Sequence, residues 1–351
     1  EELLARQLKK FFMEFCEEVW IDKFYNVVGK MTVSANKDIC DKSVYKNKNS
    51  YIVKDGHIDG SNMKVLVMAH MDEIGLMVKS IDEKGFIRVS SIGGVDPKIL
   101  PSHEVIIHGT RDIPGVIGAK PPHLLQAEDA NKSIALKDLA VDTGMSAEEL
   151  KKIVSIGDLI TLDCEGIELK NGKFSSKTID NRSGVTALIE SMKELEGIRH
   201  SADVYFAAST QEETRLTGAI ISSYVIEPDL AIVIDACHGN MPDAPKEESY
   251  ALGKGPAIGI GPILDKKMSQ TLISVAKDEN IPYQIDVEPS STGTEAWATQ
   301  VSRSGIPTVL LSIPVRYMHT AVETVHIDDI RNTGRLAARF IARLTRHMEV
   351  V

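Results

Sequence analysis

Residues 65–73 read VLVMAHMDE, a short apolar run that ends in His70 and Asp72. A run this short and this apolar is typical of a strand that is buried on both faces. Positions i and i+2 of an extended chain point to the same side, so His70 and Asp72 can face one cleft. There the imidazole can bind a metal ion while the carboxylate orients the ring. For this motif alone, an ordinary His and Asp at a strand end is the simpler interpretation.

Four further apolar runs have the same character and are predicted to be strands: 204–208, 231–234, 257–260 and 308–313. Four other segments space their apolar residues like amphipathic helices: 2–19, 185–195, 268–279 and 328–348. Buried strands that alternate with helices indicate an α/β sheet that is covered by helices on both faces.

Residues from about 76 to 175 differ from this pattern. They contain short strand-like pieces that are broken by Gly, Pro and Asp, and one helix with a capping box, Ser146-x-x-Glu149. We therefore predict an α/β domain formed by residues 1–75 and 176–351, with a small, mainly β domain inserted at 76–175.

Composition excludes several classes of protein. The chain has 351 residues, of which 43% are hydrophobic and 26% charged, as expected for a globular protein of about two domains. Its net charge of −10 argues against a nucleic-acid binder. No apolar run approaches the ~18 residues of a membrane span, and the acidic start predicts no secretory signal. The cysteines lie far apart and are expected to be reduced, which indicates a cytoplasmic protein: Cys16, Cys40, Cys164 and Cys237.

Further polar residues lie where open α/β sheets bind their ligands, at strand ends and helix starts: Asp180, Glu212, Glu213, Asp235 and His319. Asp180 could simply cap a helix, and paired glutamates are common on solvated loops. Asp235 is harder to explain, because a carboxylate directly after four buried apolar positions is costly unless it is paired or metal-bound. Together with His70 and Asp72, these side chains fit a two-metal hydrolytic site for zinc, cobalt or manganese.

The chain resembles a known family, the dinuclear metallo-aminopeptidases. That family includes glutamyl and deblocking aminopeptidases and the large tetrahedral peptidases, and some members have been named endoglucanases. The matching stretches cover most of the chain: AHMDEIGLMV (69–78), GVIGAKPPH (115–123), VDTGMSAEEL (141–150), TIDNRSGV (178–185), STQEE (209–213), VID (233–235) and SIPVRYMHT (312–320). The resemblance implies a central mixed sheet flanked by helices, with the inserted domain serving dimerisation.

The resemblance also implies a role for each matched residue. Two divalent cations, zinc or cobalt with manganese as an alternative, would share one carboxylate: His70, Asp180 and Asp235 would hold the first, and Asp180, Glu213 and His319 the second. Asp72 would orient His70, and Glu212 would be the general base. Peptides would be the substrates, and the chain would associate into dimers and a dodecamer.

Three residues are weaker candidates for substrate binding. Arg215 lies where the family usually has V-G-L-R-G after Q-E-E, and it either favours acidic substrates or is a solvated or ion-paired side chain. Thr294 lies in TGTEA, where the family often has G-G-T-D-A near the substrate cleft. His123, in the inserted segment, is a candidate for reaching an active site, its own or a neighbour's. The polar stretch 126–132 beside it is predicted to be a mobile loop.

Related enzymes leave alternatives. A family of carboxypeptidases and deacylases uses nearly the same ligands, but its dimerisation domain lies between the fourth ligand and the final His. Here the long gap lies between His70 and Asp180, which favours the aminopeptidase arrangement. Deacylation or glycoside hydrolysis on this scaffold, or an inactive assembly protein, are the alternatives. Aromatic residues are only 5%, which disfavours sugar stacking, and all seven proposed site positions are intact. We predict a metal-dependent aminopeptidase.

Overall fold

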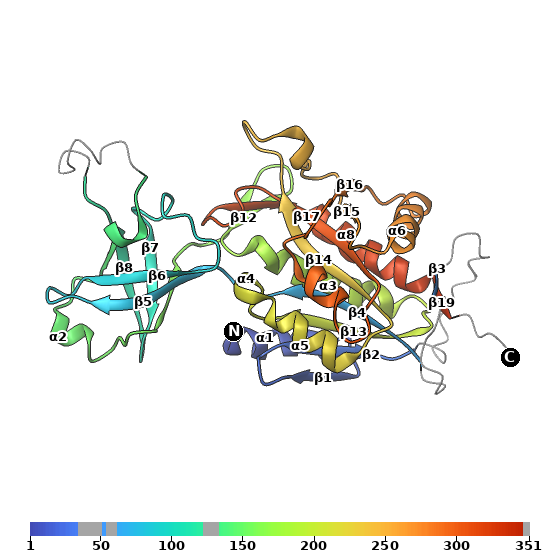
Figure 1. The fold of residues 1–351 in the computed structure, drawn as a ribbon, viewed down its shortest axis with the longest axis horizontal. Coiled ribbons are helices and arrows are strands. Elements are labelled where there is room, and N and C mark those ends of the chain that lie inside the picture. Colours follow the sequence, from blue (N-terminus) through green and yellow to red (C-terminus); the bar gives the residue numbers. More distant parts are fainter. Residues whose placement is uncertain (34–50, 54–61, 122–132, 347–351) are drawn as a thin grey trace.

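The computed structural model describes residues 1–33, 51–53, 62–121 and 133–346 (Figure 1). A large α/β unit occupies most of the molecule, and a β barrel stands beside it, on the left in Figure 1. Within the described ranges, no helix is long and apolar enough to cross a membrane.

The large unit is built on an eight-stranded sheet. Its strands are β1 (Glu18–Ile21), β2 (Val27–Met31), β4 (Met63–His70), β13 (Ala202–Ser209), β14 (Leu230–His238), β15 (Ala257–Ile260), β16 (Gln284–Val287) and β17 (Thr308–Val315). Their order across the sheet is β1-β2-β13-β4-β14-β17-β15-β16. The central strands β13, β4, β14 and β17 are parallel, whereas β2 and β15 run antiparallel to their neighbours β13 and β17. The predicted α/β fold is therefore confirmed, and the sheet is mixed.

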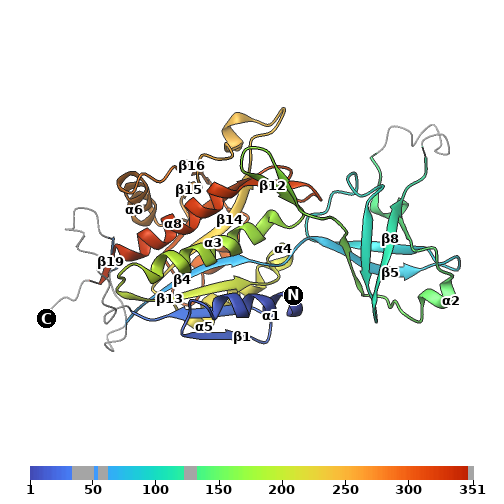
Figure 2. The same ribbon diagram turned by 180° about the vertical axis from the view of Figure 1, so that it is seen from behind.

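Helices pack on both faces because the central strands are apolar on both sides. The helices are α1 (Glu2–Phe12), α3 (Ile179–Glu196), α5 (Thr217–Ile226), α6 (Lys266–Asp278), α7 (Glu295–Gln300) and α8 (Ile327–Ala342). In β4, Val65 and Val67 belong to one core cluster with α1, α3, α6 and α8, while Leu66 and Met68 belong to another with α5 and α7. Figure 2 shows α3 and α8 side by side across the first face. Each such buried Val or Leu contributes about 1.5–3 kcal/mol.

The barrel follows β4 directly in the chain. Its strands are β5 (Gly75–Ile81), β6 (Ile87–Ile92), β7 (Glu104–His108), β8 (Asp112–Gly118), β9 (Ala140–Asp142) and β10 (Leu159–Leu162), closed in the order β10-β5-β6-β9-β8-β7. Alternate residues of β8, such as Ile113 and Ile117, are buried in its core. The short helix α2 (Ala147–Leu150) begins with the predicted capping box, in which Ser146 accepts a hydrogen bond from the Glu149 N–H.

The chain returns from the barrel through a separate small sheet. Its strands are β11 (Ile167–Leu169), β12 (Lys173–Ser176) and β18 (Glu323–His326), in the order β11-β12-β18. All of β11 and all but the last residue of β12 lie in the segment 76–175 of the sequence prediction, yet β12 pairs with β18, near the end of the α/β unit. The remaining short elements of the described residues are β3 (Tyr51–Val53), β19 (Leu344–Arg346), α4 (Glu212–Arg215) and the 3₁₀ helices at Leu136–Asp138 and Lys246–Glu248.

Two predicted helices are shorter than expected. The helix predicted over 2–19 ends at Phe12, because Glu18–Ile21 instead form β1 and pair antiparallel with β2. The helix predicted over 328–348 ends at Ala342, after which β19 pairs with β3. In both cases pairing with a strand elsewhere outweighs local helical periodicity. The predicted loop at 126–132 lies outside the described residues.

Candidate active site

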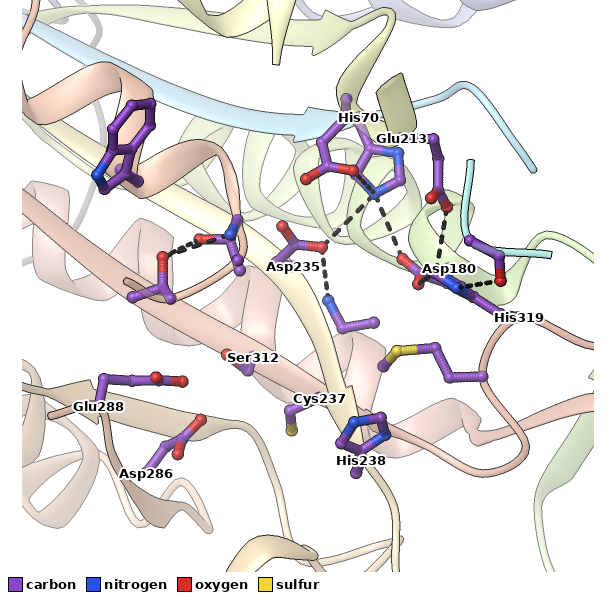
Figure 3. Close-up of a pocket in the computed structure, with 18 of the residues that line it drawn as sticks. His70, Asp180, Glu213, Asp235, Cys237, His238, Asp286, Glu288, Ser312 and His319 are labelled. Atoms are coloured by element: carbon purple, nitrogen blue, oxygen red, sulfur yellow. Dashed lines mark hydrogen bonds and ion pairs between the residues drawn. The ribbon is translucent and has the colours of Figure 1, made fainter. Parts of the chain in front are cut away.

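The predicted site residues converge at the carboxyl edge of the central sheet. His70 is the last residue of β4, Asp235 lies in β14, and His319 follows β17. Glu212 and Glu213 begin α4, directly after β13. Because the carboxyl ends of parallel strands meet at one edge, these side chains face a common cavity (Figure 3).

Asp180 lies between the two histidines. Its Oδ1 is 3.3 Å from Nε2 of His70, and its Oδ2 is 3.4 Å from Nε2 of His319. Asp180 is at the start of α3, where its φ of −81° and ψ of 104° depart from helical values. Its carboxylate therefore presents one oxygen to each imidazole, as a group shared by two cations would.

Three groups of side chains in the described ranges could hold a metal ion, each with ligand atoms within 4.8 Å of one another: His70 with Asp180 and Asp235, Asp180 with Glu213 and His319, and His70 with Glu212 and Glu213. The first two are the groups that the family resemblance implies. Their donors are imidazole nitrogens and carboxylate oxygens without sulfur, which suit zinc, cobalt or manganese. The residues present therefore fit a divalent cation.

Asp72 is buried behind His70. Its Oδ1 lies 3.5 Å from Nδ1 of His70, a contact too long for a good hydrogen bond. Its two oxygens also accept hydrogen bonds from the backbone N–H groups of Glu212, at 3.1 Å, and Glu213, at 3.2 Å. One carboxylate thus faces the imidazole and holds the turn that carries both glutamates.

Like Asp72, Glu323 holds the backbone of two site residues, here Asp180 and His319. It was not among the residues predicted from the sequence. It is buried at the start of β18, and its carboxylate accepts hydrogen bonds from the N–H groups of Asp180, at 2.9 Å, and His319, at 2.7 Å. The available signal was an acidic residue in front of Thr324-Val325, four residues after the proposed ligand His319.

Burial and crowding shift the ionisation of the site. Burial, reinforced by Asp235 and opposed by His70, raises the pKa of Glu212 to about 9. Hydrogen bonds with Asp180 and then Glu213 raise the pKa of His319 to about 11. Burial alone would lower the pKa of His70, but its carboxylate neighbours outweigh this and raise it well above the ordinary value. Without a cation, the carboxylates therefore hold protons on both imidazoles.

The cavity itself has a volume of about 910 Å³. Away from the two histidines its wall is acidic, with Asp286 and Glu288 visible in Figure 3. Tyr250 donates a 2.5 Å hydrogen bond to Asp286, and burial raises the pKa of Glu288 to about 7. Arg215 also lines this cavity.

Thr294 is a second candidate for substrate binding at this cavity. Thr294 lines the cavity, and its hydroxyl caps α7 by accepting a hydrogen bond from the N–H of Ala296. His123 lies outside the described residues.

An open α/β sheet that gathers imidazole and carboxylate groups in a cavity at its carboxyl edge is typical of metal-dependent hydrolases. The chain matches the M42 glutamyl aminopeptidase family over residues 49–336 and belongs to that family. Membership identifies it as an aminopeptidase, a hydrolase that acts on peptide bonds, and decides among the sequence alternatives in favour of peptide hydrolysis.

Individual relatives are similar to this chain over nearly its full length. A lysyl aminopeptidase of Pyrococcus furiosus is 36% identical over 321 residues, which cover 90% of this chain and 91% of the relative. The structure of aminopeptidase APDkam598 from Desulfurococcus kamchatkensis superposes with a TM-score of 0.83 at 34% identity, covering 98% of this chain and 90% of that one. The Pyrococcus horikoshii TET1 peptidase, described as able to assemble into a tetrahedron or a large octahedral shell, has a TM-score of 0.76 at 28% identity over 96% and 92% of the two chains.

Proposed function

We propose that this aminopeptidase uses two divalent cations, zinc or cobalt with manganese as an alternative, to remove N-terminal residues from peptides. One cation would be held by His70, Asp180 and Asp235, and the other by Asp180, Glu213 and His319. The observation that carries the proposal is the carboxylate of Asp180, whose two oxygens each face a different imidazole, at 3.3 and 3.4 Å.

The cations, when bound, would polarise the scissile carbonyl and stabilise the negative charge that develops on its oxygen. Glu212 is the proposed general base. Its Oε2 lies 3.8 Å from Nε2 of His70, so it reaches the same part of the cavity as the proposed ligands. It takes a proton from the attacking water and delivers it to the leaving amine. Asp72 supports this step by holding the backbone of Glu212 and facing His70.

Recognition of a free N-terminus would come from the same acidic cavity. The substrate's α-ammonium group pairs with carboxylates that line the site, and a peptide with a blocked amine lacks that charge. Arg215 and Thr294 line the cavity and are proposed to contact the substrate beyond the reacting bond. His123 is proposed to contribute to its own or a neighbouring site.

We also propose that the barrel serves dimerisation and that dimers build a dodecamer. The barrel carries exposed apolar side chains, among them Val116, Ile156 and Leu159, and the TET1 relative is described as able to assemble into a tetrahedron or a large octahedral shell. A cytoplasmic location is proposed from Cys16, Cys164 and Cys237, which are free thiols. Light scattering with and without divalent cations tests the assembly, and a monomer under both conditions would contradict it.

The function is tested with aminoacyl anilides after removal of metal by a chelator. Activity should return with zinc, cobalt or manganese, and N-acetylated versions of the same anilides should remain uncleaved. Equal rates on free and acetylated substrates would contradict recognition of the amine, and full activity in excess chelator would contradict the proposed use of cations.

A further inference from the structure

Glu323 connects two residues that lie far apart in the sequence. It begins β18, and only 2% of its surface is exposed. Its Oε2 accepts a 2.9 Å hydrogen bond from the N–H of Asp180, 143 positions earlier, and its Oε1 accepts a 2.7 Å hydrogen bond from the N–H of His319, four positions earlier. Both oxygens are thus occupied by backbone donors, and Glu323 belongs to none of the groups of potential metal ligands in the described ranges.

The two backbones that Glu323 holds are irregular. Asp180 has φ and ψ values of −81° and 104° inside the helix assignment of α3. His319 has a φ of 62°, in the left-handed region that residues with a β-carbon rarely adopt. A buried N–H group needs an acceptor, and at these two positions the carboxylate of Glu323 supplies it.

The side chains of the same two residues meet in front of Glu323. Oδ2 of Asp180 lies 3.4 Å from Nε2 of His319, and Oε1 of Glu213 lies 3.4 Å from the same nitrogen. A cation site requires its ligand distances within about 0.2 Å of their ideal values. The spacing of the two backbones therefore decides whether these three side chains can share one ion.

We propose that Glu323 is a positioning residue for the cation held by Asp180, Glu213 and His319. It fixes the distance between the backbones of Asp180 and His319 without touching the ion itself. This inference rests on the proposed two-cation function.

The chemistry of the side chain determines which variants are informative. Glu323→Gln keeps the size but replaces one oxygen with an NH₂ group, which cannot accept a hydrogen bond from a backbone N–H. Glu323→Asp keeps the charge and both acceptors but is one methylene shorter, so its carboxylate is set back from both donors and the two hydrogen bonds lengthen unless the backbone moves.

Asp329 provides a matched control. It is also buried, and its two oxygens accept hydrogen bonds of 2.6 and 2.7 Å from the N–H groups of Gly253 and Gly255. Neither glycine lines the cavity or carries a proposed ligand. Asp329→Asn therefore removes the same kind of interaction from a part of the fold that contains none of the proposed ligands.

The experiment is a calorimetric titration of chelator-treated full-length protein with Co²⁺ and, separately, Zn²⁺, together with thermal unfolding of each metal-free variant. In Glu323→Gln, the Kd of one cation should rise on the order of 10- to 100-fold, the usual effect of losing a group that orients a metal ligand, while the other cation changes less. Glu323→Asp should lie in between. Asp329→Asn should lower the Tm and leave both Kd values unchanged.

Two results would overturn the inference: Glu323→Gln binds both cations as the unsubstituted protein does, or it weakens both equally while its Tm falls as in Asp329→Asn. If Glu323→Gln does not fold, Glu323→Asp decides by the same two criteria. A failure of the proposed function looks different, because then the unsubstituted protein itself would not bind two cations.

Discussion

The backbone N–H of Glu212 donates a 3.1 Å hydrogen bond to Oδ1 of Asp72, the same oxygen that lies 3.5 Å from the imidazole of His70. The proposed base is therefore positioned by the residue that faces a proposed ligand. The side chains of the adjacent glutamates then point to different partners. Oε2 of Glu212 lies 3.8 Å from Nε2 of His70, whereas Oε1 of Glu213 lies 3.4 Å from Nε2 of His319.

This geometry predicts different results for the two glutamates. Glu212→Gln removes the base but no proposed ligand, so turnover should fall on the order of 10²–10⁴-fold while cation content and assembly stay nearly unchanged. Glu213→Gln removes a charged ligand, so one cation should be lost, and activity should partly return with added metal. Metal analysis and turnover of both purified variants are the measurements. Loss of metal in Glu212→Gln with retention in Glu213→Gln would reverse the two roles.

A second prediction concerns Gly94, where the chain leaves β6 and passes the site. A β-carbon there would lie 2.6 Å from Nδ1 of His319, closer than real contacts allow. Gly94→Ala should push the imidazole out of position and raise the Kd of a cation on the order of 10- to 100-fold. Gly118→Ala is the control, because its nearest neighbour would be 3.9 Å away. Equal cation affinity in the two variants would show that His319 does not depend on this contact.

Cation binding should also release protons. Because hydrogen bonds with Asp180 and Glu213 raise the pKa of His319 to about 11, this imidazole is protonated in the metal-free protein at pH 7. A ligand must be neutral, so metal has to displace that proton. Calorimetric titrations in two buffers of different ionisation enthalpy measure the release. Binding enthalpies that do not depend on the buffer would contradict a protonated His319 in the metal-free protein.

The same shifts predict how stability depends on pH. A raised His pKa stabilises the metal-free fold fully below the ordinary value of about 6.5, and this contribution is lost as the pH rises towards the folded value of about 11. Glu212 acts in the same direction, because burial raises its pKa to about 9 and its charged form is disfavoured in the fold. The Tm of the metal-free protein should therefore fall between about pH 6.5 and pH 9, and saturating cations should reduce that fall.

Substrate charge gives a further prediction. Apart from the proposed ligands and base, four acidic residues line the cavity: Glu247, Glu248, Asp286 and Glu288. Among the described residues, Arg215 is the only Lys or Arg that lines it. Lysyl and arginyl anilides should therefore be cleaved with a higher kcat/KM than glutamyl anilide. Glu288→Gln should reduce the preference and Arg215→Ala should increase it, each on the order of 10-fold or less, as expected for partly exposed charges. A preference for glutamyl anilide that Arg215→Ala abolishes would show that Arg215 sets specificity.

The sequence could predict the fold class because the central strands are buried on both faces. Runs such as Val65–Ala69 carry a strong apolar signal, and parallel strands are usually connected by helices. It could not predict β1, because the residues that pair with Glu18–Ile21 lie in β2, and strand pairing leaves no local periodicity. The closure of β5 to β10 into a barrel depends on similar distant pairing.

Some residues of the site could likewise be predicted from the sequence, and others could not. His70 and Asp235 follow strong strand signals, so their position at one edge could be anticipated. For Glu323 the only signal was an acidic residue close to His319, and its role could not be anticipated, because its partners are the backbone N–H groups of Asp180 and His319 and any residue carries such a group. Side chains that bind backbone groups can be recognised only once the fold brings the two segments together.

The wide separation of the site residues along the chain has a consequence for synthesis. The first of them is His70, and the last, Glu323, follows 253 positions later (323 − 70). A ribosome makes the chain from its N-terminus, so the strands and the barrel emerge before the segment that completes the site. A growing chain therefore carries an unfinished site until His319 and Glu323 have been made, and the proposed second cation lacks a ligand until then.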